Sequence, residues 1–225
     1  MDSRYTELAN RIGLGQSERI AKLFQIIADP SEADIMLKLP ATVPAVAAAL
    51  GRAEDDVASA MKTLFVKGVV FPSPKTDPPT YKMSRDLVQF HDASILWPEA
   101  PQEYLDLWQD FMETEWLGVA KTFNKIMPRP FTRVIPVGIT VPARTHVLAF
   151  EDIREIIDTA KTLSVTKCTC RLTAHKCDAK LETCLQINRA ADYNIARGTG
   201  RSLTKEEALD IVRQAVQHRA GQNPV

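Results

Sequence analysis

Apolar residues recur at three- and four-residue intervals through the first third of the chain, which is the period of an amphipathic helix. Ser17 can cap the first of these segments and Thr42 the third, while Gly51 can end the third. The pattern predicts helices over residues 17–28, 31–39, 42–51 and 53–67. The last two, joined by a turn that contains glycine, form a helix–turn–helix pattern.

Two short β-prone runs follow this pattern. Residues 68–71 and 80–83 flank a proline-rich stretch at 72–79, and apolar runs separated by turn residues predict a pair of strands. Such a pair after a helix–turn–helix forms the wing of a winged helix. The region from Leu8 to Ser84 therefore resembles the winged helix of bacterial regulators.

Helical periodicity continues between residues 85 and 130. Its long apolar stripe, which packing within a core or between domains explains most simply, consists of Leu105, Trp108, Phe111, Met112, Trp116, Val119, Phe123 and Ile126. Beyond it, prolines within and between the apolar runs predict short edge strands at 133–137 and 146–150. Residues 131–145 are the best candidate for a linker or strap.

The remaining third of the chain is predicted to be mostly helical. Helices are expected over residues 150–161 and 185–196, and a last one is expected to start at Thr204, with Glu207 completing a capping box, and to end near His218. The expected fold class is mainly α, of α+β type. We expect a winged-helix domain at 1–84, a connecting helical region at 85–130 and a helical domain with short edge strands, which contains all four cysteines of the chain, at 131–225.

Composition limits the functions that the chain can perform. Its 28 basic residues balance 28 acidic ones, so the whole protein lacks the positive field that draws proteins to nucleic acid. Without a run of eighteen apolar residues we expect no membrane span, and without a secretory leader we expect a cytoplasmic protein with reduced thiols. The oligomeric state is left open.

The candidate chemistry lies in the cysteines. All four, Cys168, Cys170, Cys177 and Cys184, fall within 17 residues, and four thiolates suffice to hold one iron–sulfur cluster or one zinc ion. Zinc ribbons pair their cysteines across two to four residues, which matches this spacing poorly. A [4Fe-4S] cluster is therefore favoured, with structural zinc as the alternative, whereas disulfides would need an oxidising compartment.

Positive charge surrounds the expected ligands. Arg171, Lys176 and Lys180 lie among the cysteines, where they would lower thiolate pKa values, offset the charge of a ligated cluster and tune its potential. His175 is left out of the ligand set because an exposed loop histidine is the commoner case.

DNA binding is the less favoured function for the helix–turn–helix. Its longer helix starts with Glu54, Asp55 and Asp56, just where such helices approach phosphates and base edges. These carboxylates would repel DNA. An iron–sulfur-dependent transcription regulator remains an alternative, as does a zinc-stapled protein-interaction module.

The cysteine motif and its flanks resemble a family of bacterial 4Fe-4S ferredoxins, also described as 4Fe-4S binding proteins. The matching stretches are Val134–Val137, His146–Ile153, Cys168–Arg171, Cys177–Asp178, Glu182–Leu185 and Gly198–Ala208. Family members also begin with a winged-helix-like segment, so the resemblance spans most of the chain.

The resemblance implies that the four matching cysteines hold a [4Fe-4S] cluster and that the protein serves anaerobic redox metabolism. Longer relatives continue into a ferredoxin module with further cysteines, whereas this sequence ends at Val225. We therefore expect an electron-transfer protein or accessory subunit that works with a redox partner or a larger oxidoreductase complex, and not a stand-alone enzyme.

Overall fold

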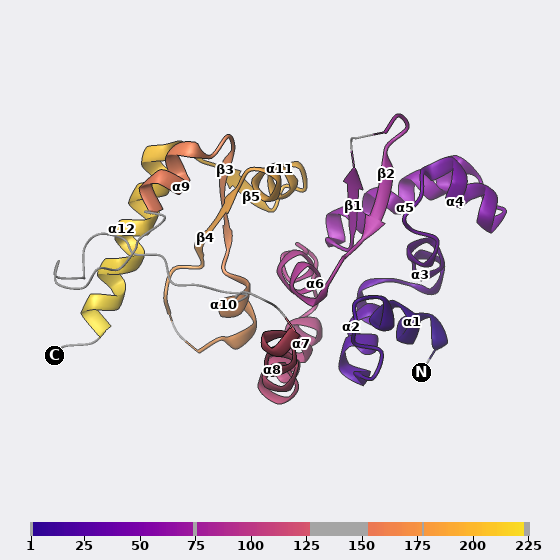
Figure 1. Ribbon diagram of the computed structural model, residues 1–225, viewed down its shortest axis with the longest axis horizontal. Helices are drawn as coiled ribbons and strands as arrows, with labels where there is room; N and C mark the ends of the chain where they lie inside the picture. The colour runs from indigo at the N-terminus through magenta and orange to yellow at the C-terminus, as the bar shows by residue number, and fades with distance from the viewer. Residues whose placement is uncertain (1, 74–75, 127–152, 177, 223–225) are drawn as a thin grey trace. The chain divides into compact units, whose positions relative to one another are not determined.

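The computed structural model describes residues 2–73, 76–126, 153–176 and 178–222. It is a mixed α and β structure whose chain divides into two compact units (Figure 1). The first unit comprises Met1–Thr114 together with Thr169–Lys176, and the second comprises Glu115–Cys168 together with Cys177–Val225. Among the described residues, none of the helices combines the length and apolar character that crossing a membrane requires.

The first unit is built mainly from helices. Its elements are α1 (Ser3–Arg11), α2 (Glu18–Ile27), α3 (Pro30–Leu37), α4 (Val43–Leu50), α5 (Glu54–Lys67), β1 (Val70–Ser73), β2 (Thr80–Met83), α6 (Leu87–Ser94), α7 (Gln102–Thr114) and α10 (Thr169–Ala174). The four predicted N-terminal helices correspond to α2 to α5 and are confirmed, whereas α1 was not predicted.

Local capping explains where these helices begin and end. The side chains of Ser17 and Thr42 accept hydrogen bonds from the backbone N–H groups of Ile20 and Ala45, as their positions predict. Gly51 ends α4 in the left-handed conformation at φ 63°, which glycine adopts without the steric cost that a Cβ would bring.

The predicted pair of strands is confirmed as an antiparallel β1–β2 ladder that pairs Val70 with Met83 and Ser73 with Thr80. A further bridge joins Ala41 to Tyr81: the Ala41 N–H donates to the Tyr81 carbonyl at 3.1 Å, and the Tyr81 N–H donates to the Ala41 carbonyl at 2.8 Å. The chain just before α4 thus extends the sheet edge that β2 presents.

Aromatic side chains form the core that joins α2, α6 and α7. Phe24 stacks on Phe90 with ring centroids 4.1 Å apart, and Trp108 meets Phe90 edge-on at 5.1 Å. Trp108, Tyr104 and Phe111 are fully buried on α7. The predicted apolar stripe is therefore core in its first half, but it is not one helix, because α7 ends at Thr114 and α8 starts at Trp116.

The second unit contains a three-stranded antiparallel sheet in the order β4-β3-β5. Its elements are α8 (Trp116–Ile126), α9 (Ile153–Thr159), β3 (Leu163–Lys167), β4 (Glu182–Ile187), α11 (Arg189–Ala196), β5 (Gly200–Ser202) and α12 (Lys205–Gln222). The edge strands predicted at 133–137 and 146–150, and the linker at 131–145, lie outside the described residues.

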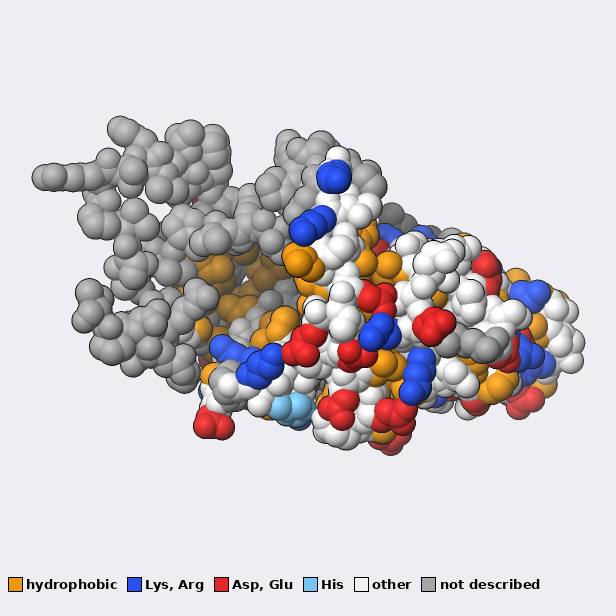
Figure 2. Space-filling view, turned by 90° about the horizontal axis from the view of Figure 1, so that it is seen from below, with side chains coloured by type: hydrophobic (Ala, Val, Ile, Leu, Met, Phe, Trp, Pro, Cys, Tyr) orange, Lys and Arg blue, Asp and Glu red, His pale blue; other side chains and the backbone are white. Residues whose placement is uncertain are grey.

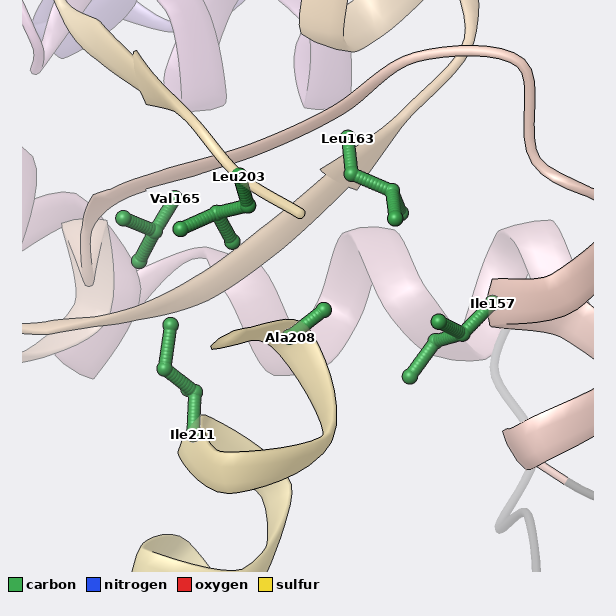
Figure 3. Close-up of a cluster of buried hydrophobic side chains, with 6 residues drawn as sticks. All are labelled: Ile157, Leu163, Val165, Leu203, Ala208 and Ile211. Carbon is green, nitrogen blue, oxygen red and sulfur yellow. The ribbon is translucent and has the colours of Figure 1, made fainter. Parts of the chain in front are cut away.

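One face of this sheet carries the hydrophobic core. Leu163 and Val165 of β3 pack with Leu203 against α9 and α12 (Figure 3), and the cluster is completed by Ile157, Ala208 and Ile211. The capping box that starts α12 is confirmed: Thr204 N–H donates to Glu207 at 2.8 Å, and Glu207 N–H donates to the Thr204 hydroxyl at 3.2 Å.

The predicted helix over residues 185–196 was wrong in its first part. Leu185, Gln186 and Ile187 belong to β4 and pair with Val165, Ser164 and Leu163, and α11 begins only at Arg189. Pairing with a central strand outweighs the helical propensity of this short run.

The opposite face of the sheet is polar and is covered by α11. Ser164 and Thr166 of β3 are 0% and 2% exposed. At Gly200 an added Cβ would meet Cβ of Asn194 at 2.9 Å and Oγ of Ser164 at 3.2 Å, so α11 packs too closely for any side chain there.

We predict that Gly200→Ala lowers the free energy of unfolding of the second unit by about 1–3 kcal/mol, because the methyl group would displace α11 from the sheet. Faster amide exchange in β3 and α11 would report this loss. Gly118→Ala is the matched control: Gly118 is helical with no atom within 4 Å of an added Cβ, so this change should be neutral or stabilise by up to about 1 kcal/mol. Equal effects of the two substitutions would contradict the packing argument.

A second prediction concerns the Asp29 cap of α3. Burial would raise the pKa of the Asp29 carboxyl, but hydrogen bonds from the backbone N–H groups of Glu32 and Ser31, at 2.9 and 2.8 Å, outweigh it and lower the pKa. Asp29→Ala should lower the free energy of unfolding by about 1 kcal/mol at neutral pH.

Because the folded-state pKa of Asp29 is lowered, the contribution of its charge is present above the ordinary value of 3.8 and is lost as the pH falls through the lowered value. Urea titrations followed by tryptophan fluorescence should therefore show a difference between wild type and Asp29→Ala that shrinks in acid. A difference that grows in acid would contradict this.

Candidate metal centre

Cys168 and Cys184 lie at adjoining ends of neighbouring strands in the second unit. Cys184 of β4 pairs with Thr166 of β3, and the ladder continues past β3 because the Cys168 N–H donates to the Leu181 carbonyl at 2.7 Å. The register shifts between Thr166 and Lys167, and Thr183 is the extra residue of this bulge. Strand pairing thus joins two of the four cysteines that are 16 positions apart in sequence.

Cys184 belongs to the face of the sheet that carries Thr166. Residues directly opposite in an antiparallel pair share a face, so Cys184 lies beside Thr166, whose hydroxyl donates to the Cys184 carbonyl at 3.5 Å. Cys168 directly follows β3, which ends at Lys167. Both cysteines are half-buried.

Cys170 lies in α10, which starts directly after Cys168. The helix buries Thr169 and Thr173, while Cys170 is exposed. The Thr173 hydroxyl donates to the carbonyls of Thr169 and Cys170, both at 3.3 Å. The short helix therefore turns its threonines inward and leaves the Cys170 thiol accessible.

α10 ends in a backbone turn just before Cys177, which lies outside the described residues. His175 adopts φ 47°, in the left-handed region, and its Nε2 lies 3.2 Å from Nε2 of Gln102. Lys176 then forms an ion pair with Glu113 at 2.7 Å.

Lys176, one of the three predicted tuning residues, has a counter-charge that sequence reasoning missed. Hydrogen bonds from Lys176 and Gln109 lower the pKa of Glu113 below its ordinary value, so this carboxylate is ionised at neutral pH. It offsets much of the positive charge that Lys176 would direct at neighbouring thiolates. Of the other two predicted tuning residues, Arg171 is half-buried and Lys180 exposed.

The described residues do not by themselves form a complete metal site. No group of three or more His, Cys, Asp or Glu side chains within the described ranges is placed to hold a metal ion. The donor chemistry of the four cysteines nevertheless suits a cluster or zinc, since all of the predicted ligands are thiols.

Comparisons with known proteins assign this chain to no family. A scan of family models, a search of curated proteins and a search of solved structures each find no match to this chain. The resemblance to 4Fe-4S ferredoxins remains a prediction that rests on the cysteine motif and its flanks.

The helix in the position of a DNA-reading helix is α5, and its charges do not favour DNA. Glu54, Asp55 and Asp56 occupy its first turn and are exposed. Near its C-terminus Lys67 is engaged inside the first unit, since its ammonium lies 2.7 Å from Glu32 and 5.6 Å from the ring centroid of Trp97.

The charges on one face of the molecule show a similar balance of acidic and basic side chains. On the face drawn in Figure 2, acidic and basic side chains are interspersed over the described residues, and they do not separate into one large positive patch. The described part of this face therefore offers little of the counterion release that drives binding to nucleic acid.

Proposed function

We propose that this protein binds a [4Fe-4S] cluster through Cys168, Cys170, Cys177 and Cys184 and acts as an electron-transfer protein or accessory subunit of an oxidoreductase. When bound, such a cluster supplies reversible one-electron transfer, taking an electron from a reduced partner protein and passing it to an oxidised one. The observation that carries the proposal is the position of Cys168 and Cys184 at adjoining strand ends, where Cys184 pairs with Thr166 and the Cys168 N–H donates to the Leu181 carbonyl at 2.7 Å.

The residues around the cysteines support this role. Strand pairing holds Cys168 and Cys184 on a scaffold whose other face is a hydrophobic core, and a rigid element positions ligands better than a loop. Lys180 contributes positive charge three residues after Cys177 and four before Cys184 in the sequence, which favours the reduced form of a cluster. With four cysteine ligands no iron is left open for a substrate, so electron transfer is favoured over catalysis at the cluster.

Anaerobic purification should give about four irons and about four sulfides per chain, with a visible sulfur-to-iron charge-transfer band. Replacing any one of the four cysteines by serine should remove most of the iron and sulfide, because serine is a harder and less acidic ligand. Ser202→Ala, which changes an exposed residue of β5 away from the cysteines, should leave both contents unchanged.

A colourless wild-type protein that contains one zinc per chain and no sulfide would contradict the cluster and assign the cysteines to a zinc-stapled interaction module. Iron that persists in all four cysteine variants would contradict the ligand assignment.

We also propose that the predicted domain at residues 1–84 is a winged helix. Support comes from the α4–turn–α5 arrangement and from the β1–β2 ladder that follows it. In addition, Ala41 pairs with Tyr81 and so extends the small sheet beyond β2. Because the start of α5 is acidic and Lys67 is engaged with Glu32, we assign this module to packing or protein docking in preference to DNA recognition.

Fluorescence anisotropy with duplex DNA at about 50 mM salt should therefore show little binding by the wild type. Neutralising the first turn of α5 with Glu54→Gln, Asp55→Asn and Asp56→Asn together should strengthen any residual binding, because it removes repulsion from the phosphates. Tight, salt-dependent binding by the wild type would instead support the iron–sulfur-dependent regulator.

A further inference from the structure

Helix α8 presents apolar side chains together with positive charge. None of its described side chains is buried: Trp116 and Phe123 are half-buried, and Leu117 is 65% exposed. Lys121 and Lys125 are exposed on the same helix, which has no acidic side chain. Leu117 and the two lysines follow one another at four-residue steps, so they lie along one line of the helix surface.

The second unit leaves this helix with little packing of its own. Within the described part of that unit, no helix or strand packs along α8 as α9 packs along α12. A large apolar side chain as exposed as Leu117 gains free energy when a partner removes it from water, and exposed apolar patches with a polar rim mark interaction sites. The face of α8 is therefore a candidate docking surface.

The first unit carries a surface of complementary shape on α4. This helix has no polar side chain, and its four exposed residues are Pro44, Ala45, Ala48 and Ala49, which we call the α4 surface. Alanine favours helix formation, but α1 and α2 of the same unit expose only polar side chains. Small side chains let another helix approach closely, because the distance between packed helices depends on the side chains at the contact.

Negative charge follows the α4 surface directly in the chain. Glu54, Asp55 and Asp56 are exposed in the first turn of α5, and within the described residues none of them forms an ion pair. Ala53, also exposed, occupies the N-cap of α5 without a side-chain cap bond, although Ser, Thr, Asp or Asn would stabilise the helix there. Departures from a local rule of this kind are expected at functional sites.

We propose that α8 of one copy of this protein docks on the α4 surface of a second copy, so that the chain associates with itself. Leu117 packs on the alanines, since large side chains on one surface fit small ones on the other. Lys121 and Lys125 face the carboxylates at the start of α5, and this charge complementarity selects the partner and its register. The inference rests on the docking role proposed above for the winged helix, and it does not involve the metal.

The expected association is weak. A contact between two short helices is smaller than a standard interface, so we expect a Kd on the order of 10 µM. Its charged part is screened by salt, so the association should weaken as the salt concentration rises.

Sedimentation velocity of the full chain under reducing, anaerobic conditions tests the docking. The molar mass should rise above that of the monomer as the protein concentration passes through the expected Kd. Leu117→Gln should raise the Kd about tenfold or more, because a buried apolar side chain at the centre of a contact carries much of its energy. Val66→Gln is the matched control: Val66 is an exposed apolar residue of α5, 40% exposed, twelve positions after Glu54, and this change should leave the Kd unchanged.

A charge exchange identifies the two surfaces and shows that they belong to different copies. Lys121→Glu with Lys125→Glu should raise the Kd about tenfold or more, and so should Glu54→Lys with Asp55→Lys, because each double variant brings like charges together. An equimolar mixture of the two double variants should recover the association, since α8 of each then meets opposite charge on the other. Recovery also shows that both variants remain folded.

The outcomes separate this inference from the proposed function. A wild type that stays monomeric, a Kd that Leu117→Gln leaves unchanged, or a mixture that associates no better than either double variant alone would overturn the docking of α8 on the α4 surface. A monomeric wild type that also fails to bind DNA would leave the docking role of the winged helix to another partner. Tight, salt-dependent binding of the wild type to DNA would overturn the docking role itself.

Discussion

The pairing of β3 with a strand on each of its edges is the constraint on which the second unit depends. Through it, alternate residues of one strand serve two different environments: Leu163 and Val165 enter the hydrophobic core, while Ser164 and Thr166 face α11. A slip of one residue would exchange the two faces. Because Cys184 pairs with Thr166, the same register decides on which face this thiol lies, so the stability of the sheet and the placement of this cysteine share one cause.

The bulge at Thr183 modifies this register where it matters for the cysteines. Regular pairing would place Thr183 opposite Lys167, but the structure pairs Lys167 with Glu182. Bulges bend the strand and redirect side chains, and they are frequent beside functional sites. Here the bulge lies between Cys184 and the hydrogen bond that joins Cys168 to Leu181, so it sets how the two cysteine-bearing strand ends leave the sheet.

The first unit provides a different kind of support. Its aromatic core fixes α6 and α7 through Phe90 and Trp108, and these helices receive α10 from a distant part of the chain. The Tyr104 hydroxyl donates to Ser94 at 2.7 Å within the same core, so the polar end of this buried ring is satisfied. A well-packed core of this kind deforms little. It therefore gives the segment that bears Cys170 a rigid surface on which to pack.

The sequence by itself determined the features that depend on neighbouring residues. The Ser17 and Thr42 caps, the left-handed Gly51, the capping box of Thr204 and the β1–β2 ladder all follow from residues a few positions apart, because capping and turns act over one helical turn or one loop. The clustering of four cysteines in one short segment is also visible without any structure.

Only the tertiary structure decided the three-stranded sheet and the attachment of α10. The sequence predicted a helix for Leu185 to Ile187, but in the structure these residues pair with β3. The contacts of Thr169 with Asp92 and of Lys176 with Glu113 join residues that are 77 and 63 positions apart in the sequence. Such contacts depend on which surfaces the whole fold brings together, and their energies arise from burial and pairing that no local pattern of residues encodes.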